Sequence, residues 1–166
     1  MIRSLHHMAF RCRNSEETCA FYEEVVGLEL AAALRLGKTR TGRPVEALHT
    51  FFRMKDGAFL AFFEVPGAPF EFRPHHDFDL HIALETDLEN QDRVLDLARR
   101  RGLETRGPSD HGFIRSIYLR DPNGYVVELT VPAPDHDAIL SRKQAEVREV
   151  LRVWSHDQAA AVEPSP

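Results

Sequence analysis

The 166-residue chain carries 21 Lys and Arg against 26 Asp and Glu, a formal net charge of -5, and 43% of its residues are hydrophobic. The basic residues are interleaved with acidic ones, which argues against a nucleic-acid-binding protein and favours a small-molecule partner. The N-terminus lacks a long apolar stretch, so we expect neither a signal peptide nor membrane association, and a cytoplasmic location.

An internal repeat organises most of the chain. The segment HMAFRCRNSEETCAFYEEVVGLEL, residues 7–30, returns in outline as HIALETDLENQDRVLDLARRRGLET, residues 81–105. Each copy predicts a strand, a helix, a glycine and a second strand. Asn14 and Thr86 are the expected helix caps, and Gly27 and Gly102 are expected to end the helices with a positive φ.

Each copy continues into a β-hairpin. The first is LHTFFRMKDGAFLAFFEV, which turns at Asp56 and Gly57, and the second is GFIRSIYLRDPNGYVVELTV, which turns at DPNG. The repeating unit is therefore βαβββ, and the fold class is α+β. We expect one domain over residues 1–134, with module one at 4–66 and module two at 77–132.

Three segments lie outside this pattern. The polar stretch 36–47 is predicted to be a mobile excursion that could act as a lid. Apolar residues at helical spacing predict an appended amphipathic helix over 135–157, packed on this domain or on a partner subunit. Residues 158–166 are expected to form a flexible tail.

Strand alternation selects the candidate site residues. His7 and His81 occupy equivalent positions of the repeat, on the strand faces opposite the apolar rows. In the last strand of module two, Glu128 shares a face with Val126 rather than with the apolar row. Two imidazoles and one carboxylate on one inner surface are a ligand set for a divalent metal ion such as Fe(II), Zn, Ni, Co or Mn.

At these residues the chain resembles the vicinal oxygen chelate superfamily, which includes glyoxalase I, fosfomycin-resistance transferases, bleomycin-binding proteins and type I extradiol dioxygenases. The resemblance covers roughly residues 4–131. It implies that the two modules form an open, cup-shaped eight-stranded barrel with helices outside, and that His7, His81 and Glu128 hold one divalent metal ion. It also implies a homodimer. Function varies widely within one fold, so the fold alone does not assign the reaction.

The stretch SDHGFIRSIYLRDPNGYVVE, residues 109–128, is similar to the extradiol ring-cleavage signature, from which only Ser109 departs. This resemblance implies that Tyr118 and His111 hydrogen-bond a bound catecholate and position oxygen. It favours Fe(II) over Ni, Zn or Mn. We therefore expect an Fe(II)-dependent extradiol-type ring-cleavage dioxygenase that acts on a small catecholic or vicinal-diol substrate with O2.

Glu64 ends the last strand of module one, and this place predicts that it is the counterpart of Glu128. There it would be either a fourth ligand, as in glyoxalase I, or a base beside the substrate. A glyoxalase I-like lyase or isomerase with Ni or Zn is therefore one alternative, and a metal-free ligand-sequestering protein of the bleomycin-resistance type is another. The predicted apolar wall of the site consists of Leu60, Phe62 and Val126.

Overall fold

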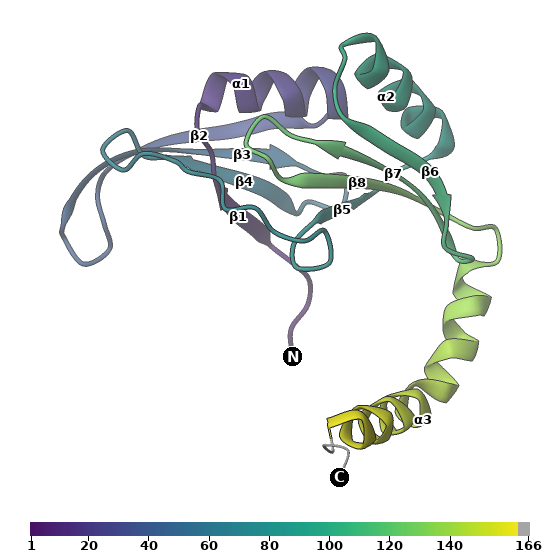
Figure 1. Ribbon diagram of the computed structural model, residues 1–166. Helices are drawn as coiled ribbons and strands as arrows, with labels where there is room; N and C mark the ends of the chain where they lie inside the picture. The colour runs from purple at the N-terminus through teal and green to yellow at the C-terminus, as the bar shows by residue number, and fades with distance from the viewer. Residues whose placement is uncertain (163–166) are drawn as a thin grey trace.

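The computed structural model describes residues 1–162, and Figure 1 shows two sheets with helices above them. Module one contains β1 (His7–Arg11), α1 (Ser15–Ala20), the wider helical turn η1 (Phe21–Val26), β2 (Glu29–Lys38), β3 (Pro44–Arg53) and β4 (Phe59–Glu64). Module two contains β5 (Ile82–Glu85), α2 (Leu88–Arg100), β6 (Thr105–Asp110), β7 (Ile114–Arg120) and β8 (Val126–Pro132), and α3 (His136–Val162) follows. The predicted α+β fold of two βαβββ modules is confirmed.

The two sheets have the same topology. Their strand orders are β1-β4-β3-β2 and β5-β8-β7-β6, and in each sheet the outer first strand runs parallel to the last strand of its module. Strands β1 and β5 are therefore edge strands, each paired on one side only. An edge strand leaves a row of backbone hydrogen-bonding groups available to another element.

Local chemistry explains where the helices begin and end. Asn14 caps α1, because its side chain accepts a hydrogen bond from the backbone N–H of Glu17 at 2.9 Å. In module two the cap is Asp87, which accepts from Asn90 at 2.8 Å, so the prediction of Thr86 is wrong by one residue. Gly27 has the predicted positive φ of 91° after η1.

The predicted excursion at 36–47 is the end of a long hairpin. Strands β2 and β3 stay paired as far as Lys38 and Pro44, and the N–H of Thr39 donates to the carbonyl of Arg43 at 2.8 Å. Cross-strand hydrogen bonds thus satisfy most of the backbone N–H and C=O groups of this segment. The expectation of an irregular loop is corrected accordingly.

One hydrophobic core lies between the helices and the faces of both sheets beneath them. Tyr22 of η1 is fully buried and its ring lies 4.9 Å from that of Phe62 on β4. The Tyr22 hydroxyl donates to Asp121, in the turn between β7 and β8, at 3.1 Å. Asp121 also accepts from the backbone N–H groups of Asn123 and Tyr125 at 2.9 and 2.8 Å. The DPNG turn therefore joins module two to module one.

Helix α3 extends away from the two sheets (Figure 1). Several of its apolar residues are exposed, among them Val147, Val150 and Leu151, and Trp154 is 64% exposed. The helix continues to Val162, beyond the predicted end at 157, and the last four residues of the predicted tail lie outside the described residues. None of the helices within residues 1–162 is long and apolar enough to cross a membrane.

Candidate functional site

Glu128 lies on the face of the second sheet that points away from α2. Its neighbours on β8, Val127 and Leu129, are buried in the core beneath that helix. Ala83 of β5 and Tyr118 of β7 lie directly opposite Glu128 on either side, and side chains opposite one another share a face. Glu128 is only 5% exposed, so its carboxylate requires a polar or charged partner.

His81 supplies that partner. It directly precedes β5, and its Nε2 lies 3.3 Å from Oε2 of Glu128. Its Nδ1 lies 2.9 Å from the backbone carbonyl of Asp77, which only an N–H at Nδ1 can satisfy. This hydrogen bond fixes Nδ1 as a protonated nitrogen and turns Nε2 toward the carboxylate, where Nε2 donates to Glu128 when it carries a proton and offers a lone pair to a metal ion when it does not. A carbonyl behind the imidazole is the usual support of a metal-binding histidine.

Tyr118 and His111 meet next to this pair. The hydroxyl of Tyr118 lies 2.9 Å from Nε2 of His111, in the turn between β6 and β7. Burial, followed by the negative charge of Glu128, raises the pKa of the Tyr118 phenol. The phenol therefore stays protonated near neutral pH and remains a hydrogen-bond donor. The structure thus brings four predicted site residues together on module two.

His7 does not join this group within one chain. It lies on edge strand β1, is exposed, and its Nδ1 is 2.9 Å from that of His6. Among residues 1–162 no three His, Cys, Asp or Glu side chains are close enough to share a metal ion. A single chain therefore presents two of the three predicted ligands together and the third elsewhere.

The predicted role of Glu64 is wrong. Its carboxylate accepts a hydrogen bond from the backbone N–H of Ser15, at the start of α1, at 2.7 Å. It thus lies on the face covered by helices, where it satisfies an N–H that the helix cannot bond itself. Strand pairing identifies the true counterpart of Glu128. In module two, Glu128 lies opposite Ala83 of β5. The residue of module one equivalent to Ala83 is Ala9 of β1, and it lies opposite Ala61. The counterpart of Glu128 is therefore an alanine.

The three residues of the predicted apolar wall lie on two different kinds of face. Val126 shares the face of Glu128, as expected. Leu60 and Phe62 are at most 1% exposed and belong to the core beneath the helices. The site-side face of β4 instead carries Phe59 and Phe63, in register with His7 and Arg11 of β1. Every residue from 58 to 63 is apolar, so alternation alone could not choose the face.

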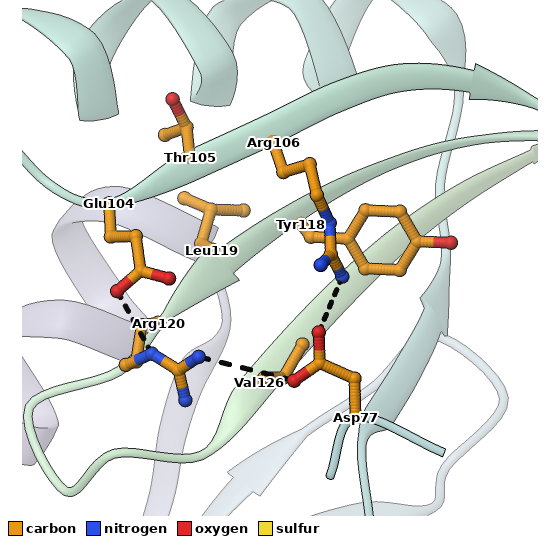
Figure 2. Close-up of a pocket in the computed structure, with 8 residues that line it drawn as sticks. All are labelled: Asp77, Glu104, Thr105, Arg106, Tyr118, Leu119, Arg120 and Val126. Atoms are coloured by element: carbon orange, nitrogen blue, oxygen red, sulfur yellow. Dashed lines mark hydrogen bonds and ion pairs between the residues drawn. The ribbon is translucent and has the colours of Figure 1, made fainter.

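Sequence reasoning also missed an ionic cluster beside Tyr118, shown in Figure 2. Arg106 of β6 lies directly opposite Tyr118, and its guanidinium carbon is 4.6 Å from the centre of the tyrosine ring. Arg106 and Arg120 both approach Asp77, at 2.7 and 4.0 Å. The sequence signal was weak, because Asp77 lies between β4 and β5, at the boundary of the two modules and outside any strand.

Comparison with known families is consistent with this arrangement. The model of the Glyoxalase/Bleomycin resistance protein/Dioxygenase superfamily matches residues 4–129 of the chain. The chain belongs to this superfamily. The match spans both βαβββ modules and ends just after Glu128. No curated protein matches the chain in sequence.

Solved structures of superfamily members share the fold. A glyoxylase/bleomycin resistance protein/dioxygenase domain from Frankia sp. EAN1pec has a TM-score of 0.65 at 14% identity, covering 80% of this chain and all (100%) of that one. The fosfomycin resistance protein FosX from Mesorhizobium loti has a TM-score of 0.61 at 23% identity, covering 84% and 99%. A point mutant of FosX from Listeria monocytogenes, solved with Mn(II) and 1S,2S-dihydroxypropylphosphonic acid, has a TM-score of 0.59 at 21% identity, covering 83% and 99%.

Proposed function

We propose that this superfamily member is a metal-dependent enzyme that cleaves the ring of a small catecholic substrate with O2, as an extradiol-type dioxygenase. The observation that carries the proposal is the contact between Tyr118 and His111 beside the His81–Glu128 pair. A phenol and an imidazole next to a metal-binding pair can orient a chelated diol and transfer its protons. Val126 supplies apolar surface on the same face.

The donor set fits a divalent metal ion. Nε2 of His81 is not bonded to Asp77 and can offer its lone pair to a metal ion in place of a proton, and Glu128 provides a buried carboxylate 3.3 Å away. With the imidazole of His7, these groups make the two-histidine, one-carboxylate set that leaves positions open for substrate and oxygen. The metal ion, which we propose to be Fe(II), would mediate charge transfer between the diol and O2 when bound.

The protein groups have separate tasks in this proposal. Tyr118, whose phenol stays protonated, donates a hydrogen bond to an oxygen of the bound substrate. His111, which contacts the same hydroxyl, exchanges a proton with it as the substrate changes charge. The carbonyl of Asp77 holds the His81 ring in its orientation. A dioxygenase needs these positioning groups more than it needs a strong protein base.

Ala61 argues against the glyoxalase alternative. Glyoxalase I-like chemistry with Ni or Zn would use a second glutamate at the counterpart of Glu128. Strand register gives that place to Ala61, which cannot bind a metal ion. A metal-free binding protein is also disfavoured, because it has no need for a buried carboxylate beside an oriented imidazole.

The test is anaerobic metal binding followed by an oxygen electrode. The protein is titrated with Fe(II), Mn(II), Ni(II) and Zn(II), and the Fe(II) form is then offered a panel of catechols. We expect one metal ion per site and oxygen consumption matched to formation of a yellow ring-cleaved product. Fosfomycin is included because FosX shares the fold, and its consumption without oxygen uptake would favour the FosX type of activity instead. Absence of stoichiometric metal binding would contradict the proposal.

We further propose that the protein is a homodimer in which a second copy supplies His7 to the His81–Glu128 pair. Three features support it. His7 lies on edge strand β1, and His81 directly precedes edge strand β5. Within residues 1–162, one chain does not bring the three ligands together. Helix α3 also exposes an apolar surface. Exposed apolar side chains along a helix are stabilised when a partner covers them.

A subunit-mixing experiment tests this arrangement. His7→Ala and Glu128→Gln each remove one ligand, and neither variant alone should hold metal at a complete site. In a co-expressed mixture, a mixed dimer of the two variants has one site with both mutations and one with neither. Random pairing therefore restores about a quarter of the sites if His7 acts across the dimer. No restoration would mean that His7 serves its own chain.

A further inference from the structure

We infer that Arg106 and Arg120 form a subsite for the acid group of the substrate, and that Asp77 occupies this subsite in the free protein. The inference rests on the proposed function, because it names the substrate class of the same site: vicinal oxygens with a carboxylate or similar anion on the same small molecule.

Two arginines converge on one carboxylate. Nη2 of Arg106 lies 2.7 Å from Oδ2 of Asp77, and Nη2 of Arg120 lies 4.0 Å from Oδ1. Figure 2 shows the Asp77 carboxylate between the two guanidinium groups. Arg106 and Arg120 come from neighbouring strands, β6 and β7. Guanidinium groups from two strands that face one carboxylate make a binding arrangement suited to any planar anion.

The cluster is adjacent to the proposed metal ligands. Arg106 lies opposite Tyr118, and Tyr118 lies opposite Glu128, so the three side chains form one row across the sheet face. Strand spacing places the backbone of Arg106 about 10 Å from that of Glu128. Arg120 lies opposite Val126 in the next row on the same face. A ligand that contacts both the arginines and the metal bound at Glu128 therefore needs one ring between its acid group and its two vicinal oxygens.

The ring of Tyr118 provides the surface between these two ends. Its hydroxyl points to His111, while Arg106 covers its face at 4.6 Å from the centre. A ring that binds between Arg106 and Glu128 would therefore lie beside an aromatic side chain. The pocket lined by the two arginines, Tyr118, Val126 and Asp77 is small, at about 40 Å³.

Asp77 is suited to be displaced. It belongs to the linker between β4 and β5, so its carboxylate can leave without breaking any strand pairing. In the described part of the chain, that carboxylate forms ion pairs with these two arginines and with no other residue. The Arg106 and Asp77 side chains are 60% and 28% exposed, and ion pairs that solvent reaches stabilise a protein little. The backbone carbonyl of Asp77, which holds His81, is a separate group.

This separation permits a sharp test with Asp77→Asn. The variant keeps the backbone carbonyl that orients His81 but removes the competing negative charge. Glu104→Gln is the matched control, because Glu104 contacts Arg120 at 3.0 Å but from its other side, with 69% of its side chain exposed. Arg106→Gln removes the subsite itself. Binding of 3,4-dihydroxybenzoate and of catechol to each protein is measured anaerobically by calorimetry, with and without metal.

We expect Asp77→Asn to bind 3,4-dihydroxybenzoate about tenfold more tightly than the wild type, with catechol affinity changed less than about twofold. Arg106→Gln should abolish the preference for the acid, and Glu104→Gln should tighten acid binding less than Asp77→Asn does, because Glu104 contacts Arg120 alone. Metal affinity should be the same in all four proteins. Unchanged or weaker acid binding by Asp77→Asn, or equal gains for catechol, would overturn the inference. Tighter acid binding in this experiment, together with no oxygen consumption in the oxygen-electrode test, would retain the subsite and reject only the dioxygenase proposal.

Discussion

Replacing Glu128 by Gln is expected to lower the affinity for divalent metal ions by at least about 100-fold, since loss of a supporting group alone costs roughly 10- to 100-fold. Glutamine keeps the shape of the side chain but removes the buried negative charge that lies 3.3 Å from Nε2 of His81. The measurement is equilibrium dialysis of Fe(II) and Mn(II) without oxygen. Oxygen consumption should fall in the same variant, because substrate chelation requires the metal ion.

Glu85→Gln is the matched control for this experiment. Glu85 lies on the same face of the sheet, two residues after Ala83, and is exposed. It should bind metal like the wild type. His81→Ala should reproduce the loss seen with Glu128→Gln, because both groups belong to one site. Wild-type affinity in Glu128→Gln, or an equal loss in Glu85→Gln, would place the metal ion elsewhere.

Replacing Asp121 by Ala is expected to destabilise the fold by about 3 kcal/mol, because an unpaired buried donor costs about 1–3 kcal/mol. The Asp121 carboxylate is buried and accepts from the Tyr22 hydroxyl and from the backbone of Asn123 and Tyr125. The substitution leaves these donors unpaired in the core and removes a bond between modules. Urea denaturation, followed by circular dichroism, measures the loss.

The equivalent turn of module one provides the control. Asp56 precedes the turn glycine there and accepts one hydrogen bond, from the N–H of Ala58 at 2.9 Å, while remaining exposed. Asp56→Ala should therefore cost less than about 1 kcal/mol. Equal losses in the two variants would mean that Asp121 acts only as a local turn residue and does not join the modules.

Much of the candidate site follows from local pattern. Strand alternation places His81, Glu128 and Tyr118 on one face, because alternation is a property of the backbone itself. The family resemblance assigns His111, and the structure places it against the Tyr118 hydroxyl. In these segments one strand face is apolar and the other is not, so the sequence pattern is sufficient to assign each side chain to its face.

Other assignments depend on how distant strands are offset. The sequence predicts that Glu64 matches Glu128, because both come near the end of a last strand. Register shows that Ala61 holds that place and that Glu64 supports α1 instead. A shift of one residue moves a strand's side chains to the opposite face, and strand pairing, not strand sequence, sets the offset.

The sequence by itself determined the two-module βαβββ fold, the turn glycines and the polar face that carries His81, Glu128 and Tyr118. These depend on the period of side chains along one strand or helix and on backbone conformations that glycine permits. Only the tertiary structure decided which face of β4 lies beneath the helices, where α3 extends, and that linker residue Asp77 reaches two arginines on the site face. Those outcomes arise from contacts between segments far apart in the chain, which no local pattern specifies.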